Sequence, residues 1–186
     1  MRRCPHTFCE PVWRRREQLL ASTLPPIQAW LFDKGSLTRR LQQACSGNFR
    51  VEVVDLHWQR PLLNERRRLA MPARQVALVR QVYLYCDEKP CVFARTIIPG
   101  ATLSGAERHL AVLGNRPLGA VLFADPRMHR EPMEFTRLQP GERLFDTAVQ
   151  RLDVTPAAIW GRRSQFYLAA KPLLVNEIFL PPIEKL

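Results

Sequence analysis

The chain has 186 residues, and its 28 Lys and Arg against 17 Asp and Glu give a formal net charge of +11. This length fits one domain with its own core, and a hydrophobic content of 46% excludes a mainly disordered chain. No stretch reaches the roughly 18 apolar residues that span a bilayer, and the N-terminus lacks the apolar run of a secretory signal, so we expect a cytoplasmic protein without a transmembrane segment.

Residues 13–45 are predicted to be mainly helical. An amphipathic helix is expected over 13–21, a short apolar turn over 27–32 and a second helix over 37–45, for which Ser36 is a suitable N-cap. The front of the molecule is therefore predicted to be built from helices.

From residue 49 onward the hydrophobic pattern changes to alternation, which is typical of strands. Six segments are expected to be strands: 49–58, 74–86, 91–99, 131–138, 159–170 and 173–180. Helices are expected over 105–113, 117–123 and 142–151, and a loop with a helical turn over 60–73. The order predicts an α+β fold, in which a single domain has an antiparallel β-sheet with helices at the N-terminus and inserted between strands.

The positive charge is uneven, because residues 1–80 carry 15 basic and 6 acidic side chains. Such an excess leaves open a solvated basic surface, a nucleic acid, an acidic membrane surface or the capture of small anions. No aromatic residues are interleaved with the arginines at 66–68, so a base-stacking groove is not indicated. We expect no specific nucleic-acid partner, while a peripheral membrane contact stays open.

The cysteines do not form a recognisable framework. The chain has five, at positions 4, 9, 45, 86 and 91, and an odd number in a cytoplasmic chain argues against disulfides. Cys86 and Cys91 flank a turn and are expected to be two buried thiols. Cys4, His6 and Cys9 lack a fourth ligand, so we expect no metal site.

Three expected strands each carry one charged residue within an otherwise apolar face: Arg80, Arg95 and Glu177. In the expected strand 74–86, for example, Arg80 lies on the same face as the apolar residues Leu78 and Val82. A charge at a core-facing position costs several kcal/mol unless it is paired or hydrogen-bonded. These positions therefore need partners, either inside the protein or in a ligand.

Two interpretations stay open. In one, an arginine and a glutamate form a buried pair that holds the sheet in register. In the other, Arg80 binds a carboxylate in a closed pocket and Glu177 meets a hydroxyl or an acidic C–H group, since a guanidinium grips a carboxylate with two hydrogen bonds. Arg95 is expected to support such a pocket from behind rather than to contact a ligand.

Five segments, in this order, resemble the chorismate pyruvate-lyase family. They are WLFDKGSLTRRL at 30–41, ARTIIPGATLSG at 94–105, LGNRPLGAVLF at 113–123, IWGRRS at 159–164 and KPLLVNEIFLP at 171–181. The resemblance implies a chorismate lyase-like fold over a single domain, 1–186. This chain departs from the family pattern by a basic N-terminal extension at 1–29 and a longer inserted segment at 124–156, which is expected near the mouth of the pocket.

The resemblance also implies site residues. The family's carboxylate-binding arginine falls on Arg80, and its active-site glutamate falls on Glu177. Backbone contacts to the substrate fall on Leu37, where the family often has methionine, and on Leu118. A main-chain contact is insensitive to that change of side chain.

By this resemblance the protein would convert chorismate into pyruvate and 4-hydroxybenzoate, the first committed step of ubiquinone biosynthesis. Aromatisation drives the reaction, so no metal or redox cofactor is expected. A sealed pocket predicts slow product release and product inhibition. We expect a monomer whose partners are the substrate and this product.

Other functions stay open. Effector domains of some bacterial transcription regulators resemble the same fold and bind small molecules without catalysis. Such regulators carry a DNA-binding domain ahead of the effector domain, and residues 1–29 are too few for one. A basic nucleic-acid-binding protein and a lyase that makes another hydroxybenzoate isomer are the remaining alternatives.

Overall fold

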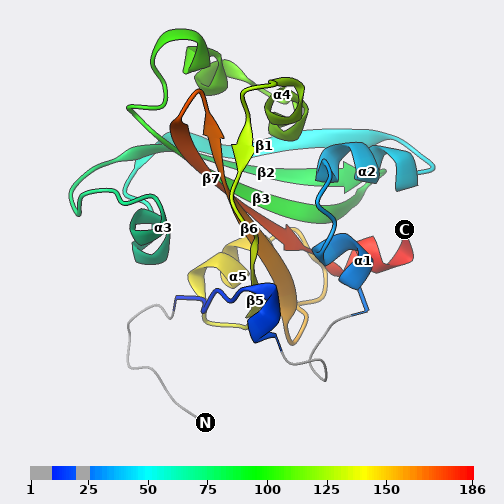
Figure 1. Ribbon diagram of the computed structural model, residues 1–186. Coiled ribbons are helices and arrows are strands. Elements are labelled where there is room, and N and C mark those ends of the chain that lie inside the picture. Colours follow the sequence, from blue (N-terminus) through cyan, green and yellow to red (C-terminus); the bar gives the residue numbers. More distant parts are fainter. Residues whose placement is uncertain (1–9, 20–25) are drawn as a thin grey trace.

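A seven-stranded antiparallel sheet organises the computed structural model, which describes residues 10–19 and 26–186 (Figure 1). The strands lie in the order β1-β2-β3-β7-β6-β4, and β5 also pairs with β6. Their bounds are β1 Phe49–Gln59, β2 Ala77–Cys86, β3 Lys89–Pro99, β4 His129–Arg130, β5 Glu134–Leu138, β6 Ile159–Leu168 and β7 Lys171–Phe179. The predicted α+β class with an antiparallel sheet is confirmed.

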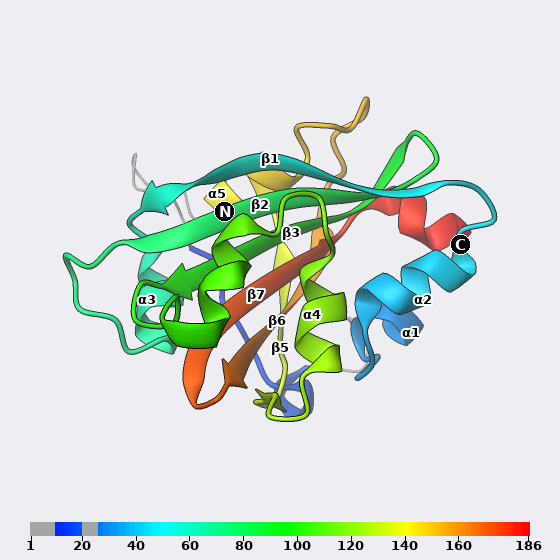
Figure 2. The ribbon, with the colours of Figure 1, turned by 90° about the horizontal axis from the view of Figure 1, so that it is seen from above.

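Short helices cover both faces of this sheet. The α-helices are α1 Gln28–Leu31, α2 Leu37–Ala44, α3 Leu63–Arg68, α4 Leu118–Ala124 and α5 Arg143–Ala148. The 3-10 helices are η1 Arg16–Gln18, η3 Gly105–Val112 and η4 Pro181–Lys185. Seen from above, α2 and α4 lie in front of the strands (Figure 2), and α3 and α5 lie on the other side. Within the two described ranges, no helix is long and apolar enough to cross a membrane.

The strand β2, which lies between β1 and β3, is buried along its whole length because the sheet is covered on both faces. Alternation therefore sends its residues into two different interiors. Val82 and Leu84 join one hydrophobic cluster with α2, whereas Tyr83 joins another with α5. A charged residue on either face of β2 or β3 must find its partner inside the protein or in a ligand.

Arg95 of β3 finds its partner on the α3 side of the sheet. Its Nε and Nη2 donate to the two carboxylate oxygens of Glu65 at 2.9 and 3.2 Å, and Asn176 Nδ2 donates to the same carboxylate at 3.0 Å. Glu65 is 1% exposed. For Arg95, the first interpretation is therefore correct: it forms a buried ion pair, although the sequence did not indicate Glu65 as its partner.

The structure contradicts the expectation that the chain has no disulfide. Cys45, which follows α2, is bonded to Cys86 at the end of β2, and Cys91 is a free buried thiol. Strand β1 pairs antiparallel with β2 so that Phe49 lies opposite Cys86, and this brings the end of α2 beside it. The expectation was wrong because a pairing across 41 positions depends on this register, which the cysteine count does not contain. Cys4, His6 and Cys9 lie outside the described residues.

Several element boundaries differ from the expectations. The predicted helix over 13–21 is wrong for its described part, where Arg14 forms a backbone bridge with Phe135 of β5 and only η1 is helical. The expected helix over 105–113 is the 3-10 helix η3. The expected loop with a helical turn over 60–73 is confirmed, and the turn is α3. The expected strand and helix within 124–156 are confirmed by β5 and α5.

The Arg95–Glu65 pair predicts a large loss of stability on removal of one partner. Glu65→Ala leaves a buried guanidinium without its carboxylate, so the free energy of unfolding should fall by about 3–5 kcal/mol, measured by urea denaturation. The matched control is Glu88→Ala, because the side chain of Glu88 is 91% exposed in its pair with Arg50 and its loss should change stability little. Equal losses in the two variants would contradict the structural role of the buried pair.

Candidate active site

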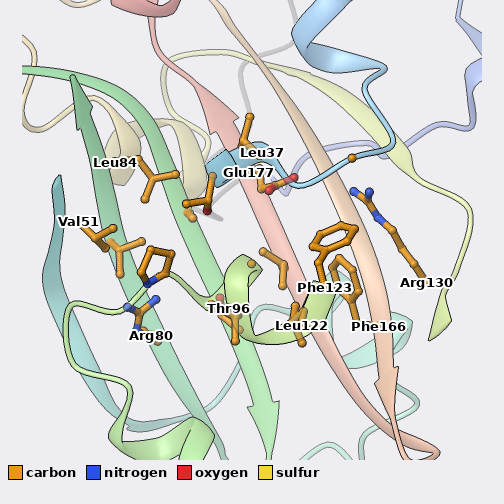
Figure 3. A pocket seen from close by; sticks show the side chains of 18 residues that line it. Leu37, Val51, Arg80, Leu84, Thr96, Leu122, Phe123, Arg130, Phe166 and Glu177 are labelled. Carbon is orange, nitrogen blue, oxygen red and sulfur yellow. The ribbon is translucent and has the colours of Figure 1, made fainter. Parts of the chain in front are cut away.

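A cavity lies between one face of the sheet and the helices α2 and α4 (Figure 3). Its walls are mostly aliphatic and aromatic, and the strands supply Val51, Val82, Leu84, Ala94, Phe166 and Val175. The covering segments supply Leu37, Pro117, Leu118, Leu122 and Phe123. Three charged side chains reach into this apolar setting: Arg80, Arg130 and Glu177. A concave apolar site with a few polar groups is the usual form of a small-molecule site.

Arg80 projects from the middle of β2 and is 3% exposed. Its Nη2 donates to the carbonyl oxygens of Gly114 and Arg116, at 2.8 and 3.2 Å, while its buried Nε has no acceptor. Among residues 10–19 and 26–186, Arg80 has no carboxylate within 4.0 Å. Burial lowers the pKa of the Arg80 guanidinium to about 10, so the group is still a cation at neutral pH. The cavity therefore contains a desolvated positive charge with unused hydrogen-bonding capacity.

Glu177 of β7 lines the same cavity but has a different partner. Nε of Arg162 on β6, the residue directly opposite Glu177 in the sheet, donates to its carboxylate at 2.6 Å. Arg162 is fully buried, and its Nη1 also donates to the carbonyl oxygens of Trp30 and Asp33 at 3.0 and 2.6 Å. The structure thus brings Arg80 and Glu177 to one cavity without pairing them with each other, as the second interpretation requires.

Leu37 and Leu118 are the first residues of α2 and α4, and both line the cavity. The two helices approach closely at Gly119, where a Cβ atom would lie 3.2 Å from Thr38 Oγ1. The first amides of a helix have no intrahelical acceptor. Their main-chain N–H groups are therefore free of helical bonding where the two helices cover the cavity.

Arg95 does not line this cavity. It lies between Ala94 and Thr96 in β3, whose side chains do line it, so alternation directs Arg95 to the α3 side of the sheet. Its contact with Glu65 is on that side. The expected support of the pocket from behind is thus limited to packing through the sheet.

Sequence reasoning missed Arg162 and Arg130. Arg162 and Arg163 are consecutive residues of a strand that is buried on both faces, so one arginine had to enter each interior. That doublet was a usable signal. Arg130 lies in β4, a strand of two residues, where alternation cannot be read.

Arg130 is held by three groups around the cavity. Its Nε donates to Ser164 Oγ at 2.9 Å, its Nη1 to the carbonyl oxygen of Lys34 at 3.0 Å and its Nη2 to Met133 Sδ at 3.1 Å. Burial lowers its pKa. Arg130 lies on the opposite side of the cavity from Arg80 (Figure 3). With two cations and a fixed carboxylate between apolar walls, the cavity can bind an anionic ring compound away from water.

Comparison with known proteins places the chain in a family. The family model described as chorismate lyase matches residues 9–185. A relative from Nitrosomonas europaea is 43% identical over 157 residues, covering 84% of this chain and 88% of its own length. A relative from Pseudomonas aeruginosa is 40% identical over 172 residues and covers 92% of each chain. Both carry the name "Probable chorismate pyruvate-lyase".

Solved structures are similar in fold at much lower identity. PhnF from Mycobacterium smegmatis gives a TM-score of 0.57 at 10% identity, covering 81% of this chain and 66% of that one. The C-terminal domain of the histidine utilization repressor from Pseudomonas syringae pv. tomato gives 0.54 at 13% identity, covering 73% and 93%. These likenesses concern the fold alone. Because the family model spans nearly the whole chain and the relatives are 40–43% identical to it, the chain belongs to the chorismate lyase family.

Proposed function

We propose that this protein is a chorismate pyruvate-lyase, which releases pyruvate from chorismate and forms 4-hydroxybenzoate for ubiquinone synthesis. The observation that carries the proposal is the apolar cavity in which Arg80, unpaired with any carboxylate of residues 10–19 and 26–186, lies with the fixed carboxylate of Glu177. Both residues are at the positions that the family resemblance marks.

Arg80 binds the ring carboxylate of the substrate. It is a desolvated cation whose Nε has no acceptor among the residues that the structure describes, so a carboxylate would supply the missing charge and hydrogen bond. The main chain at Leu37 and Leu118 completes the contacts from the covering helices. The apolar walls strengthen each of these interactions because they exclude water.

Glu177 acts at the other end of the ring. The reaction breaks the bond between C3 and the ether oxygen and removes the hydrogen from C4, so that the ring becomes aromatic and pyruvate leaves with that proton. Glu177 contacts the 4-hydroxyl and either accepts the C4 proton or orients the ring for its internal transfer. Arg162 holds the carboxylate in place during this step. Electrons balance within the substrate, so the proposal invokes no redox cofactor.

Release of the ring product needs movement of the cover. Helices α2 and α4 lie over the cavity and approach closely at Gly119, and the Cys45–Cys86 disulfide ties the end of α2 to β2. A ligand beneath them leaves only when they separate. This supports slow release of 4-hydroxybenzoate and inhibition by it.

A change at Arg80 is expected to weaken substrate and product alike. Both contain the ring carboxylate, so Arg80→Met should raise the KM for chorismate and the Kd for 4-hydroxybenzoate by about 100-fold or more. Pyruvate release and calorimetric titration measure the two constants. The control is Arg137→Met, an exposed arginine on β5 that should behave as wild type. Unchanged values in a folded Arg80→Met variant would place the binding site elsewhere.

A change at Glu177 is expected to affect turnover more than binding. In Glu177→Gln the amide oxygen can still accept from Arg162, but the side chain no longer accepts a proton, so kcat should fall by about 100-fold or more. The Kd for 4-hydroxybenzoate should change by less than about tenfold, because a neutral acceptor still meets the 4-hydroxyl. A variant with wild-type kcat would contradict the role proposed for this carboxylate.

A further inference from the structure

The charges around the cavity do not cancel. Glu177 and Arg162 form a pair, at 2.6 Å, that is neutral as a unit. Arg80 and Arg130 have no carboxylate within 4.0 Å in the described part of the chain. Arg80 is buried and Arg130 is partly buried. A cation that is withdrawn from water without a counter-ion is costly, so both positions favour an anion from outside the protein. The net positive charge around the cavity therefore favours a ligand that carries two negative groups.

The two cations are placed apart. Arg80 comes from β2 and is held by the carbonyls of residues 114 and 116, whereas Arg130 comes from β4 and is held by Ser164 and the carbonyl of Lys34. In Figure 3 they lie on opposite sides of the cavity, and Glu177 points into the side nearer Arg130. Each cation therefore faces the cavity from its own side and can bind an anionic group of its own.

Several N–H donors of Arg130 have no strong acceptor among the described residues. A guanidinium carries five N–H groups, and Arg130 gives one to Ser164 and one to Lys34 through Nε and Nη1. Its Nη2 meets only the thioether of Met133, which is a weak acceptor. A carboxylate would be a much stronger partner for the Nη atoms. The side chain is thus fixed in place but incompletely used.

Arg130 also borders a second, wider hollow on the outside of the molecule. That hollow has four basic side chains, Arg15, Arg16, Lys34 and Arg130, against two acidic ones, Glu17 and Glu131. Its excess positive charge favours the approach of small anions. Arg130 lines both the inner cavity and this outer hollow, so the side of the cavity at Arg130 is the one that lies next to the basic hollow.

We infer that Arg130 binds the second carboxylate of the substrate, the one on the enolpyruvyl side chain, and so selects a dianion over a monoanion. This inference rests on the proposed function. Chorismate would lie with its ring carboxylate on Arg80 and its side chain toward β4. After the C3–O bond breaks, pyruvate is left against Arg130 beside the outer hollow, and 4-hydroxybenzoate stays on Arg80.

The test compares the two ligands by equilibrium binding. Chorismate has both carboxylates and 4-hydroxybenzoate has only the one on the ring. Comparing their dissociation constants therefore distinguishes the contribution of Arg130 to binding from that of Arg80. Both constants are measured by calorimetry in Glu177→Gln, which slows turnover, and in Glu177→Gln combined with Arg130→Met. The added change should raise the Kd for chorismate by about 30-fold or more and the Kd for 4-hydroxybenzoate by less than about threefold. Arg80→Met in the same background should weaken both, and Arg137→Met neither.

Other outcomes of these titrations test whether Arg130 binds the second carboxylate. Equal weakening of both ligands by Arg130→Met, or of neither, would overturn the inference. If Arg130→Met does not fold, Arg130→Lys keeps the charge without the paired donors and should still weaken chorismate selectively. Because binding needs no catalysis, a wild-type protein without turnover would contradict the proposed function while this comparison still decides the role of Arg130.

Discussion

The ion pair between the buried Arg162 and the partly buried Glu177 joins the sheet to the segment that covers it. Arg162 has no exposed surface, and its three-way bonding fixes a carboxylate in the cavity and two carbonyls at the end of α1. Removing the carboxylate would leave Arg162 buried and without its counter-ion, which costs several kcal/mol. The same contact therefore orients the glutamate and holds the chain that leads into α2. Site geometry and cover depend on one arginine.

The two faces of the sheet treat buried charge in different ways. On the α3 side, Arg95 donates to the carboxylate of Glu65, so its charge is neutralised within the protein. On the α2 side, Arg80 and Arg130 are desolvated but have no carboxylate partner in the described ranges. The first arrangement stabilises the fold. The second leaves hydrogen-bonding capacity for an anion on the face where the proposed active site lies.

Alternation in long strands marked Arg80, Arg95 and Glu177 alike, because these strands keep a period of two along their buried length, and the family resemblance selected Arg80 and Glu177 among them. It assigned sides within each strand but not the register between strands, so it could not tell that Arg95 faces away from Arg80. Arg130 lies in a strand too short to show a period. The disulfide and the bridge from Arg14 to β5 depend on contacts between distant segments, and such contacts overrode the helical pattern near Arg14.

The most direct measurement of the central claim is the product balance of the unaltered protein. Purified protein is incubated with chorismate in the presence of a chelator, and pyruvate and 4-hydroxybenzoate are quantified by chromatography. We expect the two products to appear in equal amounts, each equal to the amount of chorismate consumed. Binding of 4-hydroxybenzoate without any pyruvate would contradict it, and would instead indicate a domain that senses aromatic acids.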